Sequence, residues 1–145
     1  NIKKCERSEW AKFRKYHYLN NNLADCCVCY GLYDEEKIIG FIAIIHQPHP
    51  INKKLKRVSR LVILPDYQGI GLGTKFLNFI AEYYKKQNFD FGIVTSAKNL
   101  ISSLKKSEKW CLYRYNKKPK CISKNSKIDK NRKLRDCVTA GFMFK

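Results

Sequence analysis

Residues 57–86 read RVSRLVILPDYQGIGLGTKFLNFIAEYYKK, and this stretch carries the strongest structural signal in the chain. The apolar run 61–64 predicts a β-strand, and Pro65 ends it because proline cannot donate a hydrogen bond to a sheet ladder. Segment 68–73 places three glycines at alternate positions, which allows a tight turn and lets a ligand approach the backbone amides closely. Apolar residues at helical spacing from Leu72 onward predict a helix. The order strand, glycine loop, helix indicates an anion site, because N–H groups at a helix N-terminus attract phosphate.

Spacing decides between the familiar phosphate-binding loops. The P-loop pattern GxxxxGK[ST] fails because Thr74 stands where its second glycine should be, and the dinucleotide pattern GxGxxG fails because the glycines run GxGxG. The pattern [Q/R]-x-x-G-x-[G/A] fits, with Gln68, Gly71 and Gly73 in the fixed places. With its strand and helix, the segment resembles the GNAT superfamily of acetyl-CoA-dependent N-acetyltransferases. The alternative interpretation is a glycine-rich turn between a core strand and a core helix.

The chain has 145 residues, which suits a single domain over 1–145 with a sizeable core. The GNAT resemblance implies an α/β (α+β) fold, with a mixed, mostly antiparallel sheet of about six to seven strands and helices on both faces. It also implies a V-shaped splay between the central strand and the strand that follows the glycine-loop helix. Further elements expected from the residues are a helix begun by Ser8, strands at 26–33, 38–45, 91–95, 111–115 and 138–144, a hairpin turn at 34–37, and a helix begun by Ser96 or Asn99.

The resemblance implies acetyl-CoA as the cofactor and assigns most of its contacts to backbone groups. In the family, the central strand holds the pantetheine arm and faces the thioester carbonyl, where N–H donors stabilise the oxyanion of acyl transfer. The loop amides cradle the pyrophosphate, and an asparagine on the next helix reaches the pantetheine. The matching cofactor-binding residues here are Leu61, Val62, Ile63, Gln68, Gly69, Ile70, Gly71, Leu72, Gly73, Thr74 and Asn99.

The resemblance is poorer for catalytic residues. The family often places a Glu or His base on the central strand, nine to eleven residues before the Gln or Arg of the loop, where segment 57–59 reads Arg-Val-Ser. The family usually has a general-acid tyrosine seven residues after the asparagine that corresponds to Asn99, and this chain has Lys106 at that position. Either other side chains serve, or catalysis relies on positioning, with water carrying the proton.

The candidate catalytic residues are His17, Tyr113 and Ser59. An unperturbed histidine titrates near neutrality, so His17, expected at the end of the first helix, is the candidate base; the competing interpretation is a histidine packed among aromatic side chains. His46 and His49 lie at the end of an expected strand and in the proline-rich turn beside it. Tyr113 and Tyr115, on the expected strand after the last helix, are the candidates for the acid, and sheet packing is the competing interpretation for both.

The net charge of +18 leaves two interpretations open, a polyanionic partner such as nucleic acid or a lysine-rich solvated surface. Segment 116–136 holds nine Lys and Arg residues against two Asp, and its few apolar residues predict a flexible, basic insertion between the last two strands. Arg57 and Arg60 on the central strand indicate either recognition of an anionic acceptor or a solvated strand end.

The seven cysteines include one CxxC pair, 26–29, with no second pair to complete a zinc site, so we expect no metal. The odd cysteine count and the lack of a signal peptide predict reduced thiols in a cytoplasmic protein. No run of about 18 apolar residues predicts a membrane span.

We therefore expect an acetyl-CoA-dependent N-acyltransferase that moves an acetyl group to a primary amine by direct attack in a ternary complex. His17-Tyr18-Leu19 together with LVILPDYQGIG at 61–71 is similar to mobile-element or phage-type GNAT domains of unassigned substrate. That similarity favours an acceptor linked to nucleic acid, although the acceptor stays open. The alternative is a non-catalytic GNAT-like module that binds nucleic acid or an acidic partner through its basic face.

Overall fold

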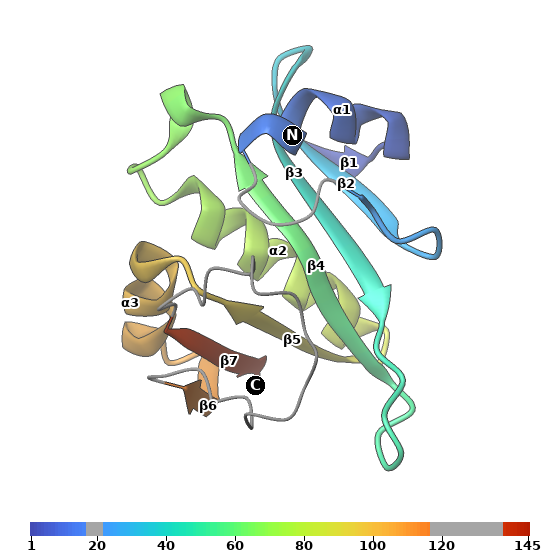
Figure 1. Cartoon of the computed structure of the whole chain (residues 1–145), viewed down its shortest axis with the longest axis vertical. Helices are drawn as coiled ribbons and strands as arrows, with labels where there is room; N and C mark the ends of the chain where they lie inside the picture. Colours follow the sequence, from blue (N-terminus) through green and yellow to red (C-terminus); the bar gives the residue numbers. More distant parts are fainter. Residues whose placement is uncertain (17–21, 117–137) are drawn as a thin grey trace, which may run out of the picture.

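The computed structural model describes residues 1–16, 22–116 and 138–145. In these ranges the chain forms β-strands, α-helices and short 3₁₀ turns, labelled in Figure 1. The strands are β1 (Ile2–Lys4), β2 (Val28–Asp34), β3 (Lys37–His46), β4 (Leu55–Ile63), β5 (Asp90–Thr95), β6 (Trp110–Asn116) and β7 (Thr139–Phe144). The helices are α1 (Trp10–Phe13), α2 (Leu72–Lys86) and α3 (Lys98–Lys106), and the 3₁₀ turns are Arg7–Glu9, Arg14–Tyr16 and Pro65–Tyr67.

The described strands form one seven-stranded sheet in the order β1-β2-β3-β4-β5-β7-β6. Among the described strands only β4 and β5 run parallel, and every other neighbouring pair is antiparallel. Parallel neighbours need a long crossover, and α2 supplies it between β4 and β5. The expected single α/β domain with a mixed, mostly antiparallel sheet is confirmed.

The predicted splay lies between β4 and β5. The two strands pair only over residues 55–58 of β4 and 90–93 of β5. Beyond this contact β4 continues to Ile63 and β5 to Thr95, and β5 pairs only with β7 there. The two central strands therefore form a fork that opens toward the glycine loop.

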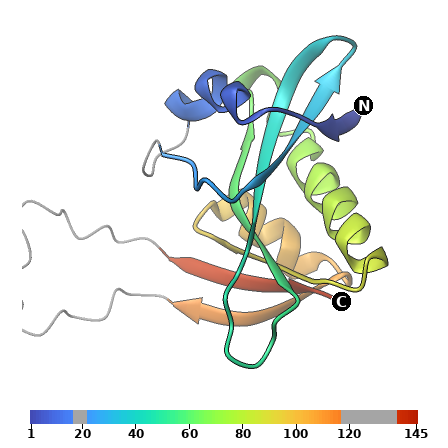
Figure 2. The same cartoon turned by 90° about the vertical axis from the view of Figure 1, so that its right-hand side faces the viewer.

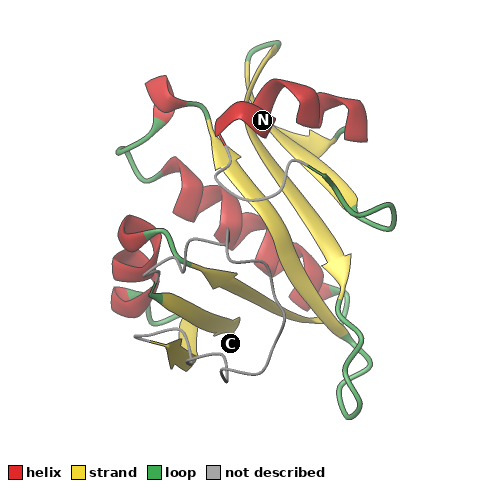
Figure 3. Ribbon diagram, in the orientation of Figure 1, coloured by secondary structure: helices red, strands yellow, loops and turns green. Residues whose placement is uncertain are grey.

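Helices lie on both faces of the sheet, as expected. Figure 2 shows α1 and α2 on opposite sides of the strands, and Figure 3 shows the same layers coloured by type of element. In Figure 1, β4 passes in front of α2, so that view looks at the α1 side of the sheet. The turn joining β2 to β3 falls at the predicted place, because β2 ends at Asp34 and β3 begins at Lys37.

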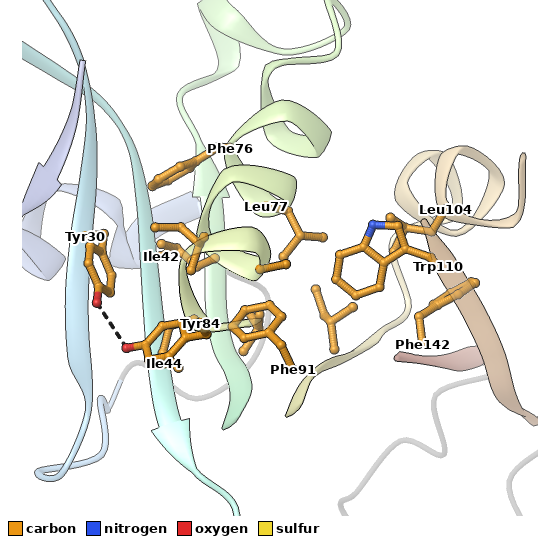
Figure 4. Close-up of a cluster of buried hydrophobic side chains, with 14 of the residues drawn as sticks. Tyr30, Ile42, Ile44, Phe76, Leu77, Tyr84, Phe91, Leu104, Trp110 and Phe142 are labelled. Atoms are coloured by element: carbon orange, nitrogen blue, oxygen red, sulfur yellow. Dashed lines mark hydrogen bonds between the residues drawn. The ribbon is translucent and has the colours of Figure 1, made fainter. Parts of the chain in front are cut away.

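The larger core fills the space between the sheet and the pair α2 and α3 (Figure 4). Leu77 and Ile80 of α2 and Leu104 of α3 are fully buried. They pack with Phe91 of β5 and Phe142 of β7, which point to the same side of the sheet. Burying each such side chain contributes about 2 kcal/mol, so this core fixes the position of α2 against the fork.

A smaller core lies on the other face, under α1. The ring centroid of Phe41, in β3, is 5.4 Å from that of Trp10 and 5.6 Å from that of Phe13. Val62 of β4 packs against the same cluster. Because β3 is buried on both faces, its sequence is apolar almost throughout.

Two expectations about helix starts were wrong, and one strand was missed. Ser8 does not cap a helix: it lies inside a 3₁₀ turn, and its hydroxyl contacts the Glu6 carboxylate over 3.0 Å. The helix after β5 begins at Lys98, with Ala97 at its N-cap, so neither Ser96 nor Asn99 opens it. The short strand β1, which pairs with β2, was not predicted because three residues leave no periodic pattern.

Within the described ranges, no helix combines the length and the apolarity that crossing a bilayer requires. Nearly all of the predicted basic insertion, and His17, lie outside the described residues.

Candidate active site

A cavity of about 570 Å³ occupies the fork between β4 and β5. The glycine loop and the first turn of α2 close one end of it, and the first turns of α3 form a side wall. Its lining residues are Tyr16, Val58, Ser59, Leu61, Val62, Ile63, Tyr67, Gln68, Gly69, Gly71, Leu72, Gly73, Thr74, Ile93, Val94, Thr95, Ala97, Asn99, Leu100 and Ser103.

The glycine loop turns at two residues with left-handed backbone. Gly69 has φ of 87° and Gly71 has φ of 80°, a region that side chains with a Cβ rarely adopt. A Cβ built at either position meets no atom within 4 Å, so both glycines border open space rather than packed protein. Gly71 is also the N-cap of α2, so the unpaired N–H groups of the first turn face the same region. This arrangement fits a diphosphate, because helix dipole and free amides both attract anions there.

Two side-chain hydrogen bonds hold the loop and the helices around the cavity. The Gln68 side-chain amide donates to the backbone carbonyl of Ile63 over 2.7 Å, which ties the loop to the end of β4. The hydroxyls of Thr74 in α2 and Ser103 in α3 are 3.1 Å apart, which joins the two helices at the cavity wall. The site is therefore braced by contacts between different elements.

The structure brings together nearly all of the expected cofactor-binding residues. Ten of the eleven line the cavity, and the exception is Ile70, whose side chain is 68% exposed at the tip of the loop. Asn99 lies in the first turn of α3, one residue after the helix begins at Lys98.

Ser59 lies at the branch point of the fork. Its neighbour Val58 pairs with Ile44 of β3 and is the last β4 residue that pairs with β5. Arg60 pairs with Ala43, so Ser59 is the extra residue of a β-bulge with no partner on β3. The bulge bends β4 where the fork opens and directs Ser59 to the cavity.

Besides Ser59, no candidate catalytic residue within the described ranges lines the cavity. Tyr113 lies on β6, outside the cavity lining. His49 is in the β3–β4 turn, where its Nδ1 accepts backbone N–H groups of Ile51 at 3.3 Å and Asn52 at 2.9 Å, and His46 ends β3 beside it. His17 lies outside the described residues.

Sequence reasoning missed several lining residues. Val94 and Thr95 enter because β5 continues past its pairing with β4, which only the three-dimensional register reveals. Ser103 had a usable signal, since it follows Asn99 by one helical turn and so shares its face. Tyr16 and Tyr67, which end two of the 3₁₀ turns, add two phenol groups to the cavity lining.

The cavity is neutral. Among the described residues that line it there is no Asp, Glu, His, Lys or Arg, and its polar side chains are hydroxyls and the amides of Gln68 and Asn99. Such a lining can orient a polar ligand and donate hydrogen bonds to a developing oxyanion, but it provides no strong base.

The described cysteines lie away from this cavity. Cys27 and Cys29 approach each other at 3.6 Å between sulfurs, close to Cys5. Burial raises the pKa of Cys5 to about 11 and the pKa of Cys29 to about 12, so both are protonated thiols at neutral pH. In the described part of the chain no three His, Cys, Asp or Glu side chains gather as a metal would require.

Comparison with known proteins relates this architecture to acetyltransferases. The chain resembles the ribosomal-protein-S18-alanine N-acetyltransferase from Escherichia coli with a TM-score of 0.69 and 13% identity, covering 99% of this chain and 92% of that one. It resembles a Bacillus subtilis acetyltransferase in complex with CoA with a TM-score of 0.67 and 12% identity, covering 100% of this chain and 97% of that one. It also resembles a GNAT family acetyltransferase from Elizabethkingia anophelis that has acetyl-CoA bound. The TM-score is 0.63 and the identity 12%, and the match covers 100% of this chain and 97% of that one.

At these identities the structures show the fold alone, and no curated protein matches the sequence significantly. The sequence profile of the Acetyltransferase (GNAT) family, however, matches residues 2–102. That match spans the glycine loop and both central strands, and the family uses acetyl-CoA as its acyl donor. The chain is therefore a member of the GNAT acetyltransferase family.

Proposed function

We propose that this protein transfers the acetyl group of acetyl-CoA to a primary amine, by direct attack of the amine on the thioester in a ternary complex. The observation that carries the proposal is the neutral cavity at the β4–β5 fork, with the glycine loop and the α2 N-terminus at one end. A channel of this form can hold a long, flexible arm between an anion site and the sheet.

The donor half of the proposal rests mainly on backbone groups. The amides of residues 69–74 bind the pyrophosphate, since Gly69 and Gly71 leave the approach open. The backbone of 61–63 holds the pantetheine arm along the edge of β4 that β5 leaves unpaired, and Asn99 contacts the arm from α3. An N–H on that free edge stabilises the oxyanion that forms during transfer.

The acceptor half relies on positioning. The amine attacks the acetyl carbon beside Ser59, whose hydroxyl is at the branch point and orients the acceptor or a water molecule. The proton leaves through water or through His17, the residue after Tyr16. Cys111 lies outside the cavity lining, so an acyl-enzyme on that thiol finds no support in the geometry.

Calorimetric titration with acetyl-CoA and with desulfo-CoA tests the donor half. We expect micromolar binding of both, because the thioester contributes few of the contacts. A panel of amines, followed by detection of released CoA thiol, then tests the transfer. Failure of acetyl-CoA to bind would overturn the proposal and leave the non-catalytic binding module as the better account.

A further inference from the structure

Beside the fork, one face of the sheet carries no helix among the described residues. On the α1 side, the small core covers β2, β3 and β4. Over β5, β7 and β6, no helix of the described residues packs on this side, because α2 and α3 both belong to the core on the other side. We call this surface the β5–β7–β6 face.

The strand register gives the side chains that share this face. Arg57, Gly92, Met143 and Cys111 are paired in sequence across β4, β5, β7 and β6, so they form one row. Side chains of directly paired residues point to the same side of a sheet. Arg57 belongs to the α1 side because Val58, the next residue, points into the larger core.

The next row begins at the cavity. Val94 lines the cavity, is 39% exposed, and pairs with Gly141, which pairs with Arg114. Tyr113, the extra residue of a β-bulge in β6, also lies here. The row therefore leads from the cavity wall across one strand to Tyr113 and Arg114.

Two glycines make this surface flat. A Cβ at Gly141 would meet the Tyr113 ring at 2.7 Å, and a Cβ at Gly92 would meet the Met143 sulfur at 2.8 Å. The Tyr113 ring thus lies directly on the backbone of β7, yet 54% of the residue is exposed. A flat aromatic ring presented in this way is a stacking platform, about one strand spacing, or ~5 Å, from the cavity wall.

The charges on this face are positive. Arg57 has no hydrogen-bond or ion-pair partner among the described residues, and Arg114 contacts the neutral side-chain oxygen of Asn116 over 3.0 Å. Asp90, at the start of β5, is already engaged by Asn52 at 2.7 Å and by Lys85 at 3.6 Å. A ligand that rests on this face therefore meets guanidinium groups that no carboxylate of the described residues neutralises.

We propose that the β5–β7–β6 face binds single-stranded nucleic acid and presents an amine carried on one of its bases to the fork. The base stacks on Tyr113, and the flanking phosphates pair with Arg57 and Arg114. Stacking needs a base with a free face, which a duplex does not offer, so the preference is for a single strand. The inference rests on the proposed acetyl transfer and names its acceptor class.

The transfer that follows is balanced by the two substrates alone. The amine nitrogen on the base forms a bond to the acetyl carbon, and the carbon–sulfur bond of the thioester breaks. The sulfur leaves as the CoA thiol, taking up the proton that the amine gives up. No oxidant, reductant or further reactant takes part.

Fluorescence anisotropy with a labelled oligonucleotide of 12 nucleotides, in the absence of acetyl-CoA, tests the binding step. We expect single strands to bind more tightly than the matching duplex or a poly-glutamate peptide of equal charge, with affinity falling as salt rises. Tyr113→Ser should weaken single-strand binding by about 5- to 100-fold, whereas Tyr113→Phe should retain it. Arg57→Gln and Arg114→Gln should each lower the slope of log affinity against log salt by about one.

Tyr115 provides the matched control. It lies on the same strand but pairs with Ala140, which points into the larger core, and the Lys105 ammonium covers its ring at 4.1 Å. Tyr115→Ser should leave oligonucleotide affinity unchanged. Gly141→Ala is a second test of the platform, because its methyl group displaces the Tyr113 ring without removing it. This variant should also weaken single-strand binding.

Three outcomes would overturn the inference. The first is equal affinity for duplex and single strand, and the second is binding of poly-glutamate that is as tight or tighter. The third is an equal loss of affinity in Tyr113→Ser and Tyr115→Ser, measured in variants that melt like the parent protein. Calorimetry with acetyl-CoA on the same preparations separates the two proposals. Acetyl-CoA binding without oligonucleotide binding defeats this inference alone, whereas oligonucleotide binding without acetyl-CoA binding defeats the proposed transfer.

Discussion

The side-chain amide of Gln68 donates a hydrogen bond to the backbone carbonyl of Ile63 over 2.7 Å. The side chain of the first residue of the loop pattern therefore binds the end of β4. Gln and Arg both carry N–H donors at the end of a flexible side chain, which explains why the pattern accepts either. The hydrogen bond fixes the distance between the anion site and the fork, the two ends of the expected cofactor site.

Removing this donor should loosen the loop without unfolding the protein. Gln68→Leu keeps the size of the side chain but loses a hydrogen bond worth about 1 kcal/mol, so the Kd for acetyl-CoA should rise about fivefold. Gln68→Arg should bind nearly as well as the parent. Gln87→Leu, at the end of α2, is the control, since its side chain only contacts the Tyr83 carbonyl at 3.3 Å. Calorimetry that finds equal Kd values for Gln68→Leu and the parent would contradict this role.

Substitution at Gly71 should separate folding from cofactor binding. Gly71→Ala places a Cβ in left-handed backbone, which costs about 1–2 kcal/mol of stability, and the methyl group enters the open space where a phosphate would approach. We expect a lower melting temperature and the loss of most acetyl-CoA affinity.

Gly73→Ala is the comparison within the same loop. Its Cβ meets the Ile63 side chain at 3.6 Å, an ordinary contact, and position 73 lies inside α2. Alanine in a helix is about 0.5–1 kcal/mol more stable than glycine, so this variant should melt at or above the parent temperature. If thermal scans ranked Gly71→Ala above Gly73→Ala, the backbone argument would be wrong.

The cysteines should differ sharply in reactivity. Thiolate is the reactive form, and burial raises the pKa of Cys29 to about 12, whereas Cys26 and Cys111 are exposed. Among the described cysteines, peptide mapping after brief alkylation at pH 8 should find label at Cys26 and Cys111 first, and at Cys29 only after denaturation. Rapid labelling of Cys29 in the folded protein would mean that the start of β2 opens readily.

The glycine loop could be predicted from sequence because it is local: Gln68, Gly71 and Gly73 stand at fixed spacing, and a strand and a helix flank them. The β5–β7–β6 face could not, because Arg57, Gly141 and Tyr113 are far apart in the chain and meet only through sheet register. The same limit hid Val94 and Thr95, whose place in the cavity depends on where β4 and β5 stop pairing. Counting from the loop named Ser59 as a candidate, but its bulge is visible only in the register with β3.

Alkaline pH should destabilise the fold through a buried tyrosine pair. The hydroxyls of Tyr30 in β2 and Tyr84 in α2 lie 3.1 Å apart in the larger core (Figure 4). Burial, followed by the hydrogen bond to Tyr84, raises the pKa of Tyr30 well above its usual value near 10, and burial likewise raises the pKa of Tyr84. A raised folded-state pKa means that the unfolded chain loses its proton first. The stabilisation is therefore complete below about pH 10 and is lost as the pH rises further.

Urea unfolding at pH 8 and at pH 11 measures this effect. Tyr30→Phe alone leaves the Tyr84 hydroxyl buried without its partner, which should cost about 1–2 kcal/mol at pH 8. The double variant Tyr30→Phe with Tyr84→Phe removes both hydroxyls and should recover part of that loss. It should also lose less stability than the parent between pH 8 and pH 11, because neither ring can ionise. An equal loss in parent and double variant would show that the alkaline transition starts elsewhere in the fold.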